Sequence, residues 1–472
     1  MMKLIAVAMF CSAVLASGAA AGEKDEQTPP SGGLWGDQDG DKKRVDDSPS
    51  NGGAAIIPSQ DISKPTGGSA DLVLAPPQEE PFDALPAVRV YGLIKPTAIY
   101  TFRGMESFSQ PNASAISAAG NPVTSFVHDQ GRFSMQIVQS RFGIAVNENG
   151  HFRGVIEVDF WDNTKPTPII NAFPRLRIAK VTWAPSKAFA IELGQDFDLH
   201  APLSTHTYNF VGGLYQAGNT GFFRQQLKLV FRPERFDLGV AIGFQGGNNA
   251  GGRDGPLELS RFPTFAARLA IVDEDLTLGV SGIATQLIFN KDRPDTRRAM
   301  AMAGAVYFTI NPSDSLDVRV EGYLGRNNAN IGLLALGFGR GSQLNPNGTV
   351  AVPAADLDEY GGFVSVRGRF SMHHALYAIA GMASIVNRDD VLPNYTRDAS
   401  NTVVLTNGTT GPGIKHNVCV RLGYELRPTR YFAYVIEGMA YDTLHVLRPE
   451  DAIVSDAHQR AYGVESGFLL TF

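Results

Sequence analysis

The chain has 472 residues, of which 43% are hydrophobic and 19% are charged, with 50 glycines. Its net charge of −6 gives no support to a nucleic-acid binder, which needs excess positive charge. Its two cysteines, Cys11 and Cys419, are too few for a disulfide scaffold or a cysteine-cluster metal site, and we expect no metal and no cofactor.

The first residues have the pattern of an export signal. Lys3 gives a positive start, and residues 4–21 form an apolar run that ends in three alanines. We expect a cleaved signal peptide at 1–21 rather than a membrane anchor, because small residues end the run and acidic residues follow it. After it, no run of about 18 apolar residues occurs, which excludes a bundle of membrane helices. Any membrane span must therefore be made of strands.

Residues 22–85 differ from the rest in composition. They are rich in Pro, Gly, Ser and Asp, hold 5 basic and 13 acidic residues, and show almost no periodic apolar pattern. These features predict a disordered, acidic periplasmic segment. Residues 37–41 are similar to part of a calcium loop, but the glycine is at the fourth position instead of the sixth, and no glutamate follows at the twelfth. Calcium binding is therefore the less favoured interpretation.

The region 86–472 is predicted to be a single domain built from strands. Apolar residues alternate with small, polar or charged residues in successive segments, as they do in strands that have two different faces. The predicted strands lie at 88–104, 133–147, 151–162, 175–184, 187–197, 222–232, 235–246, 260–272, 275–288, 296–310, 315–327, 358–371, 373–386, 414–427, 430–444 and 457–472.

The connections between these strands alternate in length. One set consists of short turns such as Pro185-Ser186, and the other of mostly long loops such as 105–132 and 328–357. Outer-membrane barrels have this arrangement, with short periplasmic turns and long external loops, whereas a soluble sandwich does not sort its loops by length. We therefore predict an all-β fold, namely a sixteen-stranded antiparallel transmembrane β-barrel.

The two faces of each predicted strand differ in polarity. In the strand at 151–162, Phe152 and Ile156 lie on one face, and Glu157 and Asp159 lie on the other. Alternation alone does not decide which face is inside, because a soluble barrel turns its apolar face inward and a membrane barrel turns it toward lipid. The export signal, the sorted loops and the C-terminus favour the membrane barrel.

One strand, at 175–184, leaves its facing open. If Arg175 and Arg177 point into the barrel, strict alternation turns Lys180 toward lipid. A bulge in this strand would remove the conflict.

The C-terminal segment carries a family resemblance. The chain ends in YGVESGFLLTF, with apolar residues at every second position and a final phenylalanine. This segment resembles the terminal strand of bacterial outer-membrane barrels, which the barrel-insertion machinery reads. By this resemblance Phe468, Leu470 and Phe472 are the membrane-insertion signal.

Further segments extend the resemblance over residues 86–472. Ser140–Ile144 and Glu192–Asp196 resemble the early strands of Gram-negative porins, and the chain looks most similar to the DcaP-like porins. The resemblance implies a homotrimer in the lipids of the outer membrane of a Gram-negative bacterium. Sixteen strands leave an aqueous channel rather than a packed interior.

The third long loop, at 198–221, is the predicted constriction. In porins the third loop folds into the barrel and narrows it, and the resemblance implies the same here. A mid-height constriction is what a selective pore needs, since it brings charged groups close to the solute. The alternative is an external loop that contacts a neighbouring subunit.

Charges of both signs lie on the predicted inner faces, and arginine far exceeds lysine, with 28 Arg and 7 Lys in the barrel region. Arginine stays charged and binds carboxylate or phosphate through two parallel hydrogen bonds, so we expect a modest preference for anions. The alternative for each arginine is that it only neutralises a wall carboxylate. The predicted pore-lining residues are Arg103, Arg141, Glu157, Asp159, Glu192, Asp196, Asp198, Arg224, Lys228, Arg268, Arg319, Glu321, Arg367, Arg369, Arg421 and Glu425.

Enzyme motifs are absent from the sequence: it contains no H-E-x-x-H, G-x-S-x-G or P-loop. We therefore predict a non-enzymatic porin that lets small hydrophilic, mainly anionic solutes diffuse through a water-filled channel. The alternatives are a substrate-specific outer-membrane transporter and a structural or adhesive barrel.

Overall fold

A computed structural model describes most of the chain from residue 86 onward. The described residues are 86–103, 131–161, 173–209, 214, 216–244, 262–290, 295–344, 347–352, 354–387, 395–397, 403–405, 413–446 and 456–472. The predicted signal peptide, the predicted acidic segment and the calcium-loop resemblance lie outside these residues.

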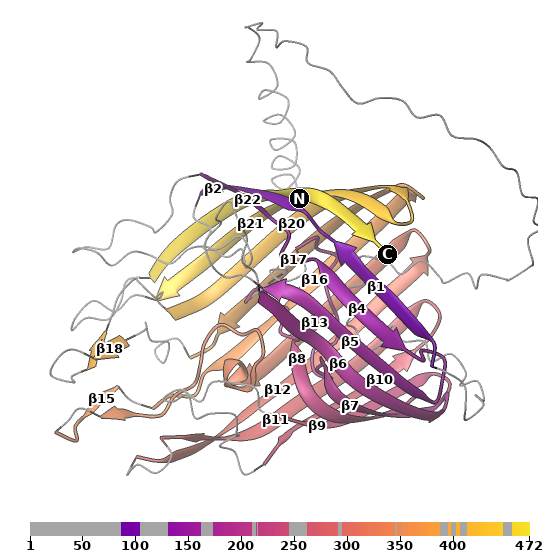
Figure 1. The fold of residues 1–472 in the computed structure, drawn as a ribbon. Helices are drawn as coiled ribbons and strands as arrows, with labels where there is room; N and C mark the ends of the chain where they lie inside the picture. Colours follow the sequence, from indigo (N-terminus) through magenta and orange to yellow (C-terminus); the bar gives the residue numbers. More distant parts are fainter. Residues whose placement is uncertain are drawn as a thin grey trace, which may run out of the picture. The chain divides into compact units, whose positions relative to one another are not determined.

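Antiparallel strands close into a barrel, which Figure 1 shows from the side. The barrel strands are β1 (Val88–Ile94), β2 (Thr97–Arg103), β3 (Arg132–Gln136), β4 (Arg141–Val146), β5 (Phe152–Trp161), β6 (Phe173–Ser186), β7 (Phe189–Phe197), β8 (Phe223–Phe231), β9 (Phe236–Gly243), β10 (Thr264–Val272), β11 (Leu276–Phe289), β12 (Arg297–Ser313), β13 (Leu316–Arg326), β16 (Asp358–Ser371), β17 (His374–Ile385), β20 (Gly413–Thr429), β21 (Phe432–Val446) and β22 (Asp456–Thr471). Because β1 and β2 are parts of one strand, and β3 and β4 of the next, the barrel has sixteen strands, and the predicted fold is confirmed.

The first and last strands close the barrel. β2 pairs with β22 along its length, and β1 pairs with the last residues of β22. The chain end takes part, since the backbone N–H of Gly92 donates to the C=O of Phe472 at 3.0 Å, and the N–H of Phe472 donates to the C=O of Gly92 at 3.1 Å. Closure gives every described barrel strand a partner on both sides except β3, whose second edge has no strand partner among the described residues.

Both of the first two strands are interrupted. Lys95 and Pro96 separate β1 from β2, and residues 137–140 separate β3 from β4. Proline has no N–H to donate to a strand ladder, so a break at Pro96 is expected. The two interruptions meet, because the N–H of Lys95 donates to Ser140 Oγ at 3.0 Å.

Exposure shows which face of the strands is inside. On β5, Phe152 is 63% and Ile156 48% exposed, whereas Glu157 is 1% and Asp159 3% exposed. The same alternation runs through β8, β9 and β10. The apolar face is therefore the outer one and the charged face the inner one, the arrangement of a barrel that lipid surrounds.

A β-bulge settles the facing of β6. Its pairing with β5 skips one residue, since Glu157 pairs with Ile178 and Val158 with Leu176. The extra residue, Arg177, shifts the alternation, so that both Arg177 and Lys180 are buried on the inner face. The facing that the sequence left open is explained by this one inserted residue.

Opposite the bulge, a glycine gives the backbone the room that it needs. Gly194 of β7 pairs with Lys180 and has φ +137°, in a region that L side chains rarely adopt. A Cβ at this position would lie 2.1 Å from the carbonyl oxygen of Ala179, so no larger residue fits without a shift of the backbone.

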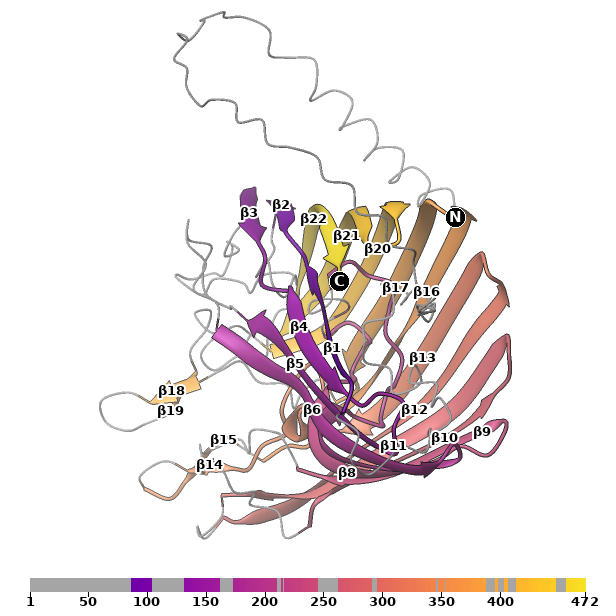
Figure 2. The same cartoon turned by 45° about the vertical axis from the view of Figure 1, so that its right-hand side comes forward.

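Two small hairpins and a 3₁₀ turn lie in the long connections. The hairpins pair β14 (Gln343–Leu344) with β15 (Val350–Val352), and β18 (Tyr395–Arg397) with β19 (Val403–Leu405). Figure 2 shows both hairpins outside the barrel wall. The 3₁₀ turn η1 is Asn328–Ile331. Among the described residues, no helix is long and apolar enough to span a membrane.

Candidate functional site

The loop between β7 and β8, residues 198–221, lies against the inner wall, and we call it the inner loop. Its described residues include Leu199, His200, Asn209 and Leu214, all with 0% exposure. Coil segments pass inside the ring of strands in Figure 2. The inner loop starts from β7, and its partners lie on strands as far away as β22, so it crosses the interior.

The first part of the inner loop is bound through its backbone. The N–H of Ala201 donates to Ser281 Oγ at 3.3 Å, and the N–H of Leu203 donates to Glu321 Oε2 at 3.0 Å. Each N–H would otherwise be an unsatisfied donor inside the barrel. Polar side chains on β11 and β13 therefore fix the path of the loop.

Glu437 of β21 anchors the middle of the inner loop. Its carboxylate accepts the backbone N–H of Tyr208 and the hydroxyl of Thr207, each at 2.9 Å. It also accepts the hydroxyl of Tyr377 at 2.9 Å and pairs with Arg421 at 2.6 Å. All five residues are buried, so this carboxylate is both neutralised and fully hydrogen-bonded.

A second anchor lies where the first and last strands meet. Asn209 donates to Glu465 Oε2 at 2.9 Å and accepts from Gln139 at 2.8 Å. Glu465 also pairs with Lys95 at 3.1 Å, and the Lys95 ammonium lies 3.8 Å from the centroid of the Tyr208 ring. The loop therefore binds to the seam that closes the barrel.

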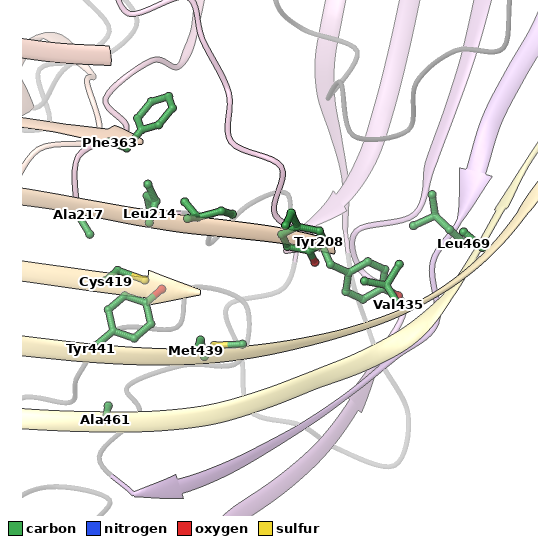
Figure 3. Close-up of a cluster of buried hydrophobic side chains, with 13 residues drawn as sticks. Tyr208, Leu214, Ala217, Phe363, Cys419, Val435, Met439, Tyr441, Ala461 and Leu469 are labelled. Atoms are coloured by element: carbon green, nitrogen blue, oxygen red, sulfur yellow. The ribbon is translucent and has the colours of Figure 1, made fainter. Parts of the chain in front are cut away.

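An apolar cluster reinforces these anchors, and Figure 3 shows it. Tyr208, Leu214 and Ala217 of the inner loop pack against side chains of the inner wall. The wall members are Phe363, Tyr377, Ile379, Cys419, Ala433, Val435, Met439, Tyr441, Ala461 and Leu469. Burial of a leucine side chain is worth about 1.5–3 kcal/mol, so Leu214 alone adds appreciably to the binding of the loop.

A second segment, residues 327–341, also lies buried inside the barrel, and we call it the second inner loop. It begins the connection at 328–357, for which loop length predicts an external position. The structure differs, since Asn330 and Ile331 are fully buried and Leu333 is 4% exposed. The apolar sequence IGLLAL at 331–336 is the signal that indicates burial, because an external loop has no need of four closely spaced large apolar residues.

Most of the predicted pore-lining side chains are on the inner face. The buried ones are Arg141, Glu157, Asp159, Asp196, Asp198, Arg224, Lys228, Arg268, Arg319, Glu321, Arg367, Arg421 and Glu425. Glu192 is half-buried and Arg369 is exposed at the end of β16. The side chain of Arg103 lies outside the described residues.

Two inner-face carboxylates are each shared by two arginines. Asp237 pairs with Arg268 at 3.0 Å and with Arg232 at 3.3 Å. Glu425 pairs with Arg367 at 3.0 Å and accepts a hydrogen bond from Arg427 at 2.7 Å. In each cluster these pairs set two guanidinium groups against one carboxylate. Both clusters are near the short turns in sequence.

A cluster of two lysines on β6 and β8 has equal numbers of the two charges. Asp196 accepts from Lys180 at 2.9 Å and from Lys228 at 2.6 Å, and Glu192 lies 3.1 Å and 3.5 Å from the same two ammonium groups. Two carboxylates and two lysines carry no net charge. On β4 to β6, Arg177 pairs with Glu157 at 2.5 Å and Arg175 with Asp159 at 2.6 Å, and the buried Arg141 lies beside these pairs.

Two glutamates bind backbone rather than cations. Glu321 accepts the N–H of Leu203 of the inner loop, and Glu359 accepts the N–H of Leu336 of the second inner loop at 2.8 Å. The hydroxyl of Tyr323 also donates to Glu359, at 2.5 Å. Among the described residues, neither glutamate has an ion pair with lysine or arginine. The neighbouring strands β13 and β16 thus hold one loop each.

Two buried histidines of the inner loop differ in their partners. His206 Nδ1 lies 2.6 Å from Ser365 Oγ, and its Nε2 lies 2.9 Å from Asp317 Oδ2. Both ring nitrogens of His200 lack a hydrogen-bond partner among the described residues. Burial lowers the pKa of each histidine to about 4, so both are neutral at pH 7. In the part of the chain that the structure describes, no group of three His, Cys, Asp or Glu residues is arranged to hold a metal ion.

The predicted insertion-signal residues Phe468, Leu470 and Phe472 are on the outer face. Their exposures are 45%, 43% and 52%. Phe468 also stacks on Phe432 of the neighbouring strand, with ring centroids 5.5 Å apart. The final residues are therefore accessible from the lipid side.

Comparison with known proteins identifies the fold. No family model matches the chain, and no curated protein matches it in sequence. Among solved structures, the outer-membrane channel DcaP of Acinetobacter baumannii is 12% identical, with a TM-score of 0.55, over 84% of this chain and 100% of that one. An anion-selective porin from Comamonas acidovorans is 10% identical over 82% of this chain and 100% of that one, with a TM-score of 0.49. The chain has the fold of the Gram-negative outer-membrane porins.

Proposed function

We propose that the chain is a non-enzymatic outer-membrane porin of a Gram-negative bacterium, through which small hydrophilic solutes diffuse passively. The observation that carries the proposal is the inner loop, which crosses a closed sixteen-stranded barrel and is anchored on the far wall by Glu437 and Glu465. A loop fixed at this position limits the size of what passes.

We also propose a modest preference for anions, carboxylates and phosphates among them. The Asp237 and Glu425 clusters each hold one more arginine than carboxylate. Several carboxylates elsewhere, including Glu321 and Glu359, are occupied by backbone N–H groups. Positive charge near the short turns, at what we propose is the periplasmic side, attracts anions at that mouth.

The remaining expectations concern assembly. We propose export by the signal peptide at 1–21, a periplasmic position for 22–85, and insertion that depends on Phe472 and the alternating residues before it. The outer face is apolar on every barrel strand from β8 to β10, which suits contact with outer-membrane lipid. A homotrimer is expected from the porin resemblance, and the mass of the detergent-solubilised protein tests it.

Conductance of the purified protein in planar bilayers tests the channel. We expect stable open-channel current, and a reversal potential in a salt gradient that shows anions to be more permeant than cations. A chain without stable current refutes the porin proposal and favours a structural or adhesive barrel. Stable current with a cation preference refutes the anion claim alone.

A substrate-specific transporter is the second candidate, and the second inner loop favours it. Two inserted loops leave less open cross-section than one loop does, and a narrow path favours solutes that fit it. Saturation of the current by one class of small anion, with little passage of neutral sugars of equal size, would distinguish this function from general diffusion.

A further inference from the structure

We propose that the second inner loop, residues 327–341, is a constriction element of its own, which holds the inner loop in place and sets the channel width together with it. The proposal rests on the channel function proposed above. It assigns to this segment a role in pore size and in the position of residues 198–221.

The second inner loop is a closed, well-bonded turn. Asn330 Oδ1 accepts the N–H of Gly339 at 2.8 Å, and Asn330 Nδ2 donates to the C=O of Gly339 at 3.1 Å. Asn327 and Gly332 adopt left-handed conformations at the two ends of η1, with φ values of 56° and 78°. The loop therefore has a fixed shape, as an element that limits a pore must.

The wall holds the base of this loop. Asn327 Nδ2 donates to the C=O of Met300 at 3.0 Å and to Asp356 Oδ1 at 2.8 Å, and Asn327 Oδ1 accepts the N–H of Leu357 at 3.0 Å. Glu359 binds the N–H of Leu336 farther along. Both ends of the loop are thus attached to strands that do not depend on the inner loop.

The two loops contact each other directly. The N–H of Leu334 donates to the C=O of Thr220 at 3.1 Å, and Gln216 Nε2 donates to the C=O of Ala335 at 3.0 Å. One of these bonds joins two backbone groups and the other joins the Gln216 side chain to the backbone, so the returning part of the inner loop is bound to the second inner loop in both ways.

Arg224 of β8 joins both loops to the wall. Its Nε donates to Asp198 Oδ2 at 2.6 Å, at the start of the inner loop, and its Nη2 donates to the C=O of Ile331 at 2.6 Å. Arg224 was predicted from the sequence as a pore-lining charge. Its bonds support a positioning role, because a guanidinium that binds several acceptors fixes their relative geometry.

The inner wall behind the loops is shaped to receive them. Ile331 and Leu333 of the second inner loop pack in one cluster with Leu199 of the inner loop. The wall members of that cluster are Ala241, Ala266, Ile283, Leu287, Phe289, Ala301 and Ala303. Small and apolar residues at inward positions do not suit contact with water, but they do suit a wall that buries two loops.

Two variants, each with a different part of the 328–357 connection shortened, test the proposal. In the test variant, residues 331–338 are replaced by two glycines, and in the matched control the hairpin at 343–352, which lies beyond the barrel wall, is replaced by a short Gly-Ser turn. We expect the test variant to show single-channel conductance raised by ~1.5-fold or more and to pass larger poly(ethylene glycol) molecules, since pore diameter governs passage. The control should match the wild-type protein.

Unchanged conductance in a test variant that still shows heat-modifiable migration refutes the proposal. Absence of current from the wild-type protein refutes the porin function instead, so the two failures are distinct. If the shortened variant does not fold, the pair Thr220→Cys and Leu334→Cys, made with Cys419→Ser, tests the loop contact. Their backbones are hydrogen-bonded, which puts the Cα atoms within disulfide reach. Mild oxidation should give one disulfide without loss of current, and failure to form it refutes the contact.

Discussion

Glu437 offers the sharpest test of how the inner loop is held. It lies at 0% exposure, pairs with the equally buried Arg421, and accepts hydrogen bonds from Thr207, Tyr208 and Tyr377. Replacement by leucine removes the charge and all of these acceptors at once. We expect the loop to leave its docked position, because the N–H of Tyr208 then loses its acceptor and Arg421 loses its carboxylate.

The size of this effect follows from burial. Removal of one partner from a buried ion pair costs about 3–5 kcal/mol, since the other charge stays uncompensated. Glu437→Gln keeps the shape and some of the acceptors, so its cost should be smaller, about 1.5–3 kcal/mol. The double variant Glu437→Leu with Arg421→Met should recover part of the loss, since it removes the orphaned charge.

Single-channel recording and thermal unfolding in detergent measure these effects. Glu437→Leu should show larger and noisier openings and a lower midpoint of unfolding, with Glu437→Gln between it and the wild-type protein. Glu148→Gln is the matched control, because its ion pair with Arg89 is partly exposed and worth about 0–1 kcal/mol. If Glu437→Leu behaves as Glu148→Gln does, the carboxylate does not hold the loop and the reasoning fails.

Three further predictions concern acid, selectivity and closure. The pKa of His206 is lowered to about 4 in the docked loop, so a released loop binds a proton that the docked loop does not, and docking should weaken as pH falls from about 6.5 toward 4. The noise of the single-channel current should rise as the pH falls over that range, and it should rise less in the His206→Asn variant than in the wild-type protein. A noise level that does not depend on pH contradicts this prediction. Arg232→Gln with Arg427→Gln should move the reversal potential toward that of a non-selective pore, and no movement contradicts the anion argument. Lys95→Met should leave the buried carboxylate of Glu465 without its cation and lower the free energy of unfolding of the closed barrel by about 3–5 kcal/mol. An unchanged temperature for the heat-induced shift in gel migration contradicts this prediction.

The sequence predicts the barrel well because its signals are local. Alternation along a strand and turn residues between strands depend on neighbours in the chain, so all sixteen strands could be placed within a few residues. The facing of β6 could not be predicted, because one inserted residue, Arg177, reverses the alternation and leaves no separate mark in the sequence.

The interior is predicted less completely because its contacts are long-range. Loop length and the porin resemblance pointed to 198–221, but the partner of each residue, such as Glu437 for Tyr208, depends on which strands face each other across the barrel. The second inner loop was missed since length alone classified 328–357 as external. Its apolar residues, Ile331 and Leu333 among them, were the available signal.

The number of charged residues likewise does not predict the electrostatics of the interior, because it does not show which charges are paired. The region 86–472 has 35 basic and 34 acidic residues, which predicts almost no field in the pore. A charge, however, contributes to the field in the pore only where no opposite charge compensates it. Glu321 and Glu359 bind loop backbone, and Asp237 and Glu425 are each divided between two arginines. We therefore expect the charge of the pore to depend on position along the wall, because the carboxylates that bind the two loops lie elsewhere than the two that arginines share.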